Sequence, residues 1–301
     1  MFARRHPFLF FLSIVCGCLT VSVLGLAGVM LAGSLLFNSS LTPGAIRQAG
    51  GNIGVVEVIG PIMSSKRVIE DIQAFRKDDR IKAIVLRIDS PGGGIGPSQE
   101  IYREVIKTGE EKRIIASMGS VAASGGYYIA SAAQGIVANP GTITGSIGVI
   151  MEYANLKAIA EKIGISPVVI KSGEFKDMGS PMRALKKNEK ALFQQLVDEL
   201  HQQFVADAAA ARHMDKTVMA KLADGRVYTG QKALTLKLID RLGNLDDAIQ
   251  WAGRLAEIEG DLVPVYPAED KMTFIKKLAD TLLKDINISG MFPQNPGYSI
   301  K

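Results

Sequence analysis

Apolar positions along the chain alternate between short continuous runs and helical spacings, a pattern that predicts an α/β fold. Short, mostly β-branched runs typical of strands occur at residues 53–59, 81–88, 113–118, 135–138, 147–151 and 167–171. Helical spacing occurs at residues 68–75, 98–107, 124–133, 156–163, 188–212, 215–222, 230–236 and 245–257. Strands that are nearly continuous in Val and Ile and alternate with helices predict a mostly parallel sheet covered on both faces.

The longest predicted helix, residues 188–212, has one continuous apolar face. That face comprises Leu192, Leu196, Leu200, Phe204 and Val205. A further amphipathic helix is expected at residues 271–286 in the C-terminal tail. Packing on the core explains its apolar face, and contact with a membrane surface is the alternative.

A long apolar stretch near the N-terminus predicts a membrane anchor. Residues 7–46 contain no Asp, Glu, Lys or Arg, and residues 7–37 exceed the roughly 20 helical residues that span a bilayer core. Arg4 and Arg5 precede the stretch, so we expect the N-terminus in the cytoplasm and the rest of the chain across the membrane. A cleaved signal peptide, or lipidation at the cysteines of residues 15–18, is the alternative.

Composition narrows the classes of protein that remain. Apolar residues make up 47% and charged residues 22% of 301 residues, which excludes a disordered or fibrous chain. The net charge of +5 is spread along the chain, without the basic runs interleaved with aromatics that nucleic acid requires. Both cysteines, Cys16 and Cys18, lie in the apolar N-terminus, so disulfides do not hold the fold and a CxxC zinc site is excluded.

Three turns that follow predicted strands are candidates for chemistry. Residues 89–94 (DSPGGG) carry three glycines, whose N–H groups can approach an oxyanion or serve only a tight turn. Residues 118–128 place Ser124 between a strand and a helix, where a serine can act as a nucleophile or cap the helix. Residues 142–148 form a third turn, for which ordinary turn chemistry is sufficient.

A serine nucleophile needs a base, and the histidines of this chain are poorly placed to provide one. His6 falls on the opposite side of the expected membrane from the turns. His201 and His213 lie on or just after the long helix, away from the ends of the strands. A Ser-His triad is therefore disfavoured.

A neutral lysine is the other established base, because burial disfavours the charged ammonium. Lys171 and Lys176 follow a predicted strand, and Phe175 could help to exclude water from Lys176. Asp177 would oppose deprotonation if it paired with Lys176, so we expect its side chain to point elsewhere. Taken alone, the two lysines are better explained as surface residues.

Five segments, taken together, resemble the signal peptide peptidase A family in its shorter, single-domain form. They are DSPGGG at 89–94, MGSVAASGGYYIA at 118–130, TGSIGVIME at 144–152, IKSGEFKDMGSP at 170–181 and ADGRVYTG at 223–230. The resemblance covers residues 52–243 and the N-terminal anchor, and the segments occur in the order typical of the family.

The resemblance implies a role for individual residues. Ser124 is similar to the family's nucleophile and Lys176 to its general base. Ser146 resembles the serine that orients this lysine, and the N–H groups of Gly93 and Gly125 resemble the oxyanion hole. Such a Ser-Lys dyad requires no metal and no cofactor.

The resemblance also implies a Clp-protease/crotonase-like fold of repeated ββα and βα units. Members of the family form ring-like homo-oligomers, octameric in the short form, in which neighbouring subunits share the dyad. The implied substrates are remnant signal peptides and other apolar peptides at the bacterial inner membrane, with the catalytic domain on the outer side. The expected organisation is a cytoplasmic N-terminus (1–6), an anchor (7–37), a linker (38–51), a peptidase domain (52–260) and a C-terminal amphipathic helix and tail (261–301).

Two other functions are compatible with the same fold. A crotonase-type acyl-CoA enzyme also uses two N–H groups as an oxyanion hole, but it needs a CoA site and usually acts in the cytoplasm. A membrane-anchored scaffold that has lost catalysis is the other alternative. The presence of all five expected site residues argues against the scaffold, and the anchor argues against the acyl-CoA enzyme.

Overall fold

The computed structural model describes residues 20, 25 and 50–268. The chain divides into two compact units, Met1–Ala45 and Ile46–Lys301, and the fold below belongs to the second. No helix in the described part of the chain has the length and hydropathy to cross a bilayer. Apart from Thr20 and Gly25, the expected anchor at residues 7–37 lies outside the described residues, as does the helix expected at 271–286.

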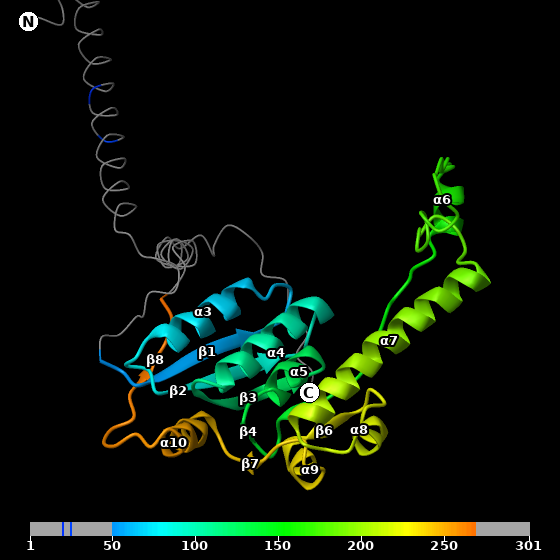
Figure 1. The fold of residues 1–301 in the computed structure, drawn as a ribbon. Helices are drawn as coiled ribbons and strands as arrows, with labels where there is room; N and C mark the ends of the chain where they lie inside the picture. The colour runs from blue at the N-terminus through cyan, green and yellow to red at the C-terminus, as the bar shows by residue number, and fades with distance from the viewer. Residues whose placement is uncertain (1–19, 21–24, 26–49, 269–301) are drawn as a thin grey trace, which may run out of the picture. The chain divides into compact units, whose positions relative to one another are not determined.

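The second unit is built around a twisted sheet whose strands are mostly parallel (Figure 1). The order is β6-β5-β3-β2-β1-β8, with β4 paired to β3 and to β7, and β5–β6 is the antiparallel pair. The strands are β1 Ile53–Ile59, β2 Ala83–Ser90, β3 Arg113–Ala123, β4 Gly135–Ala138, β5 Ile143–Gly145, β6 Val227–Thr229, β7 Arg241–Leu242 and β8 Pro264–Val265. The prediction of a mixed α/β fold with a mostly parallel sheet is therefore confirmed.

Helices cover both faces of this sheet, because successive side chains of a strand point to opposite sides. Val56 and Val58 of β1 pack toward α3, α4 and α5, whereas Ile53 and Val55 pack toward α10 (Figure 1). The helices are α3 Lys66–Lys77, α4 Ile95–Gly109, α5 Gly125–Ser131, α6 Lys157–Lys162, α7 Lys187–Ala211, α8 Lys216–Leu222, α9 Gly230–Thr235 and α10 Leu245–Leu255.

Residues 150–186 and the first half of α7 form a projecting arm, which extends away from the sheet (Figure 1). The predicted apolar face of α7 is divided by this geometry. Phe204 and Val205 are buried against the core, whereas Leu192 and Leu196 are 41% and 42% exposed. The outer half of the helix therefore presents apolar side chains to solvent in a single chain.

Two predicted strands are wrong. Residues 147–151 and 167–171 have extended or irregular backbone but no ladder partner among the described residues, and a strand requires such a partner. The short strand in the first region is instead β5, which begins four residues earlier. Val168 and Ile170 are 87% and 97% exposed, so their apolar run does not mark a strand buried within this chain.

The contact between α3 and β1 provides a test of the core. Phe75 is 1% exposed, and its ring lies so close to Gly54 that a Cβ there would be 2.6 Å from the ring. We expect Phe75→Ala to lower the free energy of unfolding by about 3–5 kcal/mol, because it removes a buried ring and leaves a cavity. Urea denaturation measures the change. Met63→Ala, at a residue that is 80% exposed, is the control and should change stability by less than about 0.5 kcal/mol.

Candidate active site

Ser124 lies at the turn between β3 and the buried helix α5, in a backbone conformation that few residues adopt. Its φ is 52° and its ψ is −119°, a region that is strained for a residue with a side chain. The turn is fixed at both ends, because Ser124 N–H donates to the Gly145 carbonyl at 2.9 Å and the Ser124 carbonyl accepts from Tyr128 N–H at 2.9 Å. The side chain makes no capping hydrogen bond to α5, which removes the alternative role of Ser124 as a helix cap.

The glycine turn after β2 presses directly against Ser124. A Cβ on Gly92, whose φ is +101°, would lie 2.8 Å from Ser124 Cβ and 2.7 Å from the Gly125 nitrogen. Ile62 holds the turn from its other side, donating to the Gly92 carbonyl at 2.9 Å and accepting from Gly94 N–H at 2.8 Å. The glycines therefore serve close approach of the main chain as well as a tight turn.

The N–H groups of Gly93 and Gly125 lie at the same place beside Ser124. A Cβ on Gly125 would be 3.3 Å from the Gly93 nitrogen and would collide with Ser98 Oγ. The first N–H groups of a helix have no partner within the helix, and neither of these two N–H groups donates a hydrogen bond within residues 50–268. Two converging main-chain donors next to a hydroxyl can stabilise an oxyanion.

A small cavity of about 20 Å³ adjoins these groups. Its polar lining is provided by the two turns and its remaining walls are largely apolar, drawn from α4, α5, α7 and the segment after β5. The lining residues are Gly93, Ile95, Ser98, Ser124, Gly125, Tyr128, Gly148, Val149, Leu200 and Phe204.

Asp89 supports the strand that leads to Ser124, a role that the sequence did not indicate. Its carboxylate accepts from Val121 N–H at 3.1 Å and from Ser120 N–H at 3.3 Å, where the register between β2 and β3 shifts. A Cβ on Gly119 would be 2.6 Å from the same carboxylate, so glycine is needed beside it. An aspartate at a strand end followed by glycines was the available signal, but its partner strand could not be read from spacing.

Ser146 follows the residue whose carbonyl accepts the Ser124 N–H, so it lies close to the main chain of the turn. It is half-buried, its φ is 49°, and its N–H donates to the Arg226 carbonyl at 2.8 Å. The structure thus brings Ser124, Ser146, Gly93 and Gly125 together in one region.

Lys176 does not join this group within a single chain. Its loop contacts the outer part of α7, where Asn188 bonds Glu174 and the Phe193 ring lies 3.3 Å from a Cβ built on Gly179. The cavity beside Ser124 is lined instead by residues 200–204 of α7, roughly 10 Å or more further along the helix axis. The Lys176 ammonium is exposed and has no hydrogen-bond or ion-pair partner among residues 50–268.

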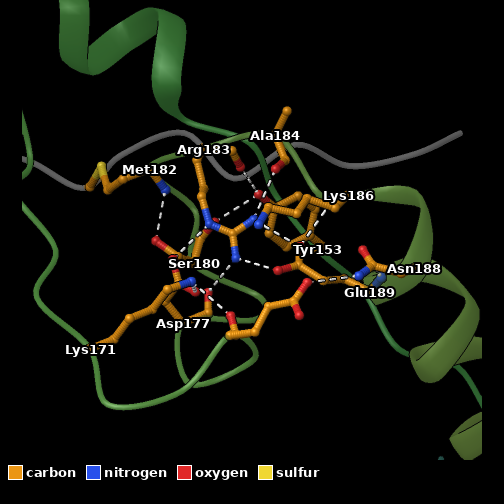
Figure 2. A network of polar contacts seen from close by, with 11 residues as sticks. Tyr153, Lys171, Asp177, Ser180, Met182, Arg183, Ala184, Lys186, Asn188 and Glu189 are labelled. Atoms are coloured by element: carbon orange, nitrogen blue, oxygen red, sulfur yellow. Dashed lines mark hydrogen bonds and ion pairs between the residues drawn. The ribbon is translucent and has the colours of Figure 1, made fainter.

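An ion-pair network fixes the loop that carries Lys176 (Figure 2). Asp177 accepts from Arg183 Nε at 2.8 Å and from Lys171 Nζ at 2.5 Å, so its carboxylate pairs with these two residues and not with Lys176. Arg183 also forms a fork with Glu189, the third residue of α7, through contacts of 2.8 and 2.5 Å. Glu189 is fully buried.

Hydrogen bonds in the network stabilise the charged carboxylates. The Arg183 guanidinium, followed by the Lys186 N–H, lowers the pKa of Glu189 to about 2. Arg183, followed by Lys171, holds the pKa of Asp177 well below its ordinary value. Neither Arg183 nor Glu189 was singled out from the sequence, because their pairing depends on a loop that folds back onto the helix.

The histidines remain outside the site. His201 contacts the Ala223 carbonyl at 2.7 Å and so joins α7 to the end of α8. Neither His201 nor His213 lines the cavity beside Ser124. Residues 50–268 contain no group of three or more His, Cys, Asp or Glu side chains placed to hold a metal ion.

Comparison with known proteins identifies the protein family to which this chain belongs. Residues 55–142 match the Clp protease family model, and residues 107–259 match the model for peptidase family S49. The chain is 43% identical to a putative protease of Synechocystis sp. over 75% of this chain and 82% of that protein. The chain belongs to peptidase family S49, as the resemblance to signal peptide peptidase A implied.

Two further relatives match smaller shares of their own length. Serine protease SPPA of Arabidopsis thaliana chloroplasts is 39% identical over 82% of this chain and 36% of that protein. A putative signal peptide peptidase of Enterococcus faecium is 37% identical over 60% of this chain and 53% of that protein. The homologues therefore support a protease.

The pKa of Glu189 predicts that the arm loosens in acid. Because its folded pKa of about 2 lies below the ordinary 4.5, its stabilising contribution is complete above pH 4.5 and is lost as pH falls toward 2. Hydrogen exchange, corrected for intrinsic rates, should show residues 171–186 losing protection over this window. Glu189→Gln should lower protection at neutral pH and flatten the pH dependence, while the exposed Glu199→Gln on the same helix should not. Protection that is constant from pH 5 to 2 in the unsubstituted protein would contradict the assignment.

Proposed function

We propose that the chain is a membrane-anchored serine endopeptidase in which Ser124 is the nucleophile and Lys176 of a neighbouring copy is the general base. The observation that carries the proposal is the strained turn at Ser124, whose hydroxyl adjoins the N–H groups of Gly93 and Gly125. A strained conformation at a strand-to-helix turn is characteristic of functional sites. Membership of peptidase family S49 supports the same reaction.

The reaction proceeds by acyl transfer to serine followed by hydrolysis. Neutral Lys176 removes the Ser124 hydroxyl proton, and the oxygen attacks the peptide carbonyl. The oxyanion is stabilised by the N–H groups of Gly93 and Gly125, each of which is worth about 3–4 kcal/mol of barrier. Lys176 then gives the proton to the leaving amine, water hydrolyses the acyl-enzyme, and Ser146 orients the lysine. No metal or cofactor takes part in these steps.

The projecting arm supports a base supplied in trans. Within one chain Lys176 is exposed and remote from the Ser124 cavity, whereas the arm that bears it is covered with exposed apolar side chains. Ile150, Ile163, Val168, Ile170 and Phe175 are between 42% and 97% exposed. Packing such arms between copies in a ring-like homo-oligomer would bury this apolar surface and bring Lys176 to the neighbour's Ser124.

The proposed substrates are apolar peptides, including remnants of signal peptides left in a bacterial inner membrane after secretion. Ile95, Val149, Leu200 and Phe204 give the surface beside Ser124 an apolar character that favours an apolar substrate, although the cavity of about 20 Å³ has room only for about one water molecule. The apolar N-terminal residues 7–37 would keep the enzyme at the membrane, with the catalytic domain on its outer side. Among the described residues that line the cavity, none carries the charge that a CoA phosphate would need.

Single substitutions test the dyad. Ser124→Ala and Lys176→Ala should each reduce cleavage of a fluorogenic apolar peptide by a factor of about 10³ or more, since either change removes the reacting pair. The purified full-length chain is assayed, with its assembly checked by light scattering. Ser120→Ala and Lys162→Ala, at exposed positions of β3 and α6, are matched controls that should remain active. A fluorophosphonate probe should label Ser124, and full activity of Lys176→Ala would refute the dyad.

Mixing the two inactive variants tests whether the dyad is shared. If Lys176 acts on the neighbour's Ser124, mixed oligomers of Ser124→Ala and Lys176→Ala chains contain interfaces at which both residues are intact. We expect dissociation and reassembly of the mixture to restore up to about a quarter of the activity, because random mixing pairs an intact serine with an intact lysine at that frequency. Reassembly without any gain, in mixtures shown to be mixed, would contradict sharing.

A further inference from the structure

We propose that Arg183 is a positioning residue for the base: it ties the loop of Lys176 to the start of α7 and holds the Asp177 carboxylate away from the Lys176 ammonium. The inference rests on the proposed function, because it concerns how the proposed base is kept free to accept a proton. It adds three residues, Asp177, Arg183 and Glu189, that the dyad itself does not use.

Arg183 links the loop that carries Lys176 to the first turn of α7. Arg183 Nη2 donates to the main-chain carbonyl of Asp177 at 3.1 Å, and the same guanidinium grips the Glu189 carboxylate at the beginning of α7 (Figure 2). Glu189 in turn accepts from Lys186 N–H at 2.9 Å. The main chain next to Lys176 is thereby tied to a rigid helix, although Lys176 itself lies in an irregular loop.

The orientation of the Asp177 carboxylate affects the charge around Lys176. Asp177 follows Lys176 in the chain, and a carboxylate close to an ammonium stabilises its charged form. The structure directs both oxygens of Asp177 elsewhere, Oδ1 to Lys171 and Oδ2 to Arg183. Lys171 also donates to the Glu174 carbonyl at 2.7 Å, within its own loop, whereas Arg183 is the partner of Asp177 that itself bonds a side chain of α7.

The burial of the network suits a fixed arrangement better than a surface ion pair. The Asp177 side chain is 13% exposed, that of Arg183 is 25% exposed, and that of Glu189 is fully buried. A two-pronged contact between guanidinium and carboxylate fixes orientation in a way that a lysine does not. The Tyr153 hydroxyl lies against the Ser180 and Arg183 carbonyls and adds a further fixed point to the loop.

Other charged groups near the loop come from three elements. The loop contributes Lys171, Glu174, Asp177 and Arg183, α7 contributes Glu189, and α6 contributes Lys157 and Glu161 beside Asp177 and Arg183. Among these, Asp177 is the acid adjacent to Lys176 in the chain, so its orientation is the one that the test must change.

The test releases Asp177 without leaving a buried carboxylate unpaired. Arg183→Gln is combined with Glu189→Gln, since removal of the guanidinium alone would strand the Glu189 charge. The variant frees Asp177 Oδ2, while Oδ1 keeps its contact with Lys171. The freed oxygen can turn toward Lys176, so the acid limb of the kcat–pH profile should move to higher pH by roughly one unit. On the acid limb kcat should fall about tenfold, with KM changing much less.

Adding Asp177→Asn to this variant provides the decisive comparison. The triple variant has an even more altered network, yet the acid limb should return toward its original position because the anion is gone. A purely structural role for Arg183 predicts the opposite, that the triple variant is no better than the double one. Arg80→Gln, which breaks the exposed ion pair with Asp78, is the control and should leave the profile unchanged.

The outcomes separate this proposal from the proposed function. If Ser124→Ala and Lys176→Ala retain activity, the dyad fails, whatever Arg183 does. If the dyad holds and the double variant assembles normally, an unmoved acid limb overturns the positioning role alone. An acid limb that moves but is not restored by Asp177→Asn overturns the charge argument. Oligomeric state and fluorophosphonate labelling of Ser124 are measured for every variant, so a collapsed site is recognised as such.

Discussion

The candidate site depends on the close approach of two main-chain segments of the same chain, the turn at Gly92 and the turn at Ser124. The turn at Gly92 lies against Ser124 so closely that no side chain fits between them, and Ser124 itself has a left-handed backbone. This arrangement is stable only because the surrounding structure fixes it: the parallel ladder of β2 and β3 delivers both turns to the same edge of the sheet. Asp89 then secures the bulged end of β3 through two N–H groups. Strain at Ser124 is thus maintained by the sheet and not by the serine's own preferences.

Lys176 is held in place in a different way from Ser124. The proposed nucleophile and oxyanion donors lie at the end of a buried sheet, whereas the proposed base lies on an arm whose loop is held by ion pairs. Arg183, with its fixed fork of donors, joins a loop without regular structure to the first turn of α7. The two parts of the proposed site therefore differ in their response to pH: the hydrophobic core carries few titrating groups, while the ion pairs weaken as pH falls from about 4.5 toward 2.

Much of the fold follows from local pattern, and the exceptions have physical causes. β1 and β4 have the predicted bounds, and the predicted helices all occur within a few residues of their expected ends, apart from the one outside the described residues. The failures at 147–151 and 167–171 are apolar runs that read as strands but lack a partner in this chain. An apolar run indicates that a segment is buried by a partner, but it does not indicate whether the partner belongs to the same chain or to another molecule.

In the candidate site, too, some features could be predicted from the sequence and others could not. Ser124, Gly93, Gly125 and Ser146 come together because they lie in turns at one edge of the sheet, an arrangement that a parallel topology implies. The pairing of Arg183 with Glu189 could not be anticipated in the same way, since it depends on the path of an irregular loop. The residue roles carried by the family resemblance remain predictions until the variants are assayed.

The exposed apolar segment at residues 167–171 has a consequence for a single chain. Val168 and Ile170 are 87% and 97% exposed, and they form an apolar surface that a second copy can cover. If neighbouring copies share the proposed dyad, a lone copy is also inactive, because Lys176 is remote from Ser124 within one chain. On the proposed sharing of the site, hydrolytic power appears only at the local density at which copies meet. On this proposal, newly made copies stay inactive until their concentration allows them to assemble.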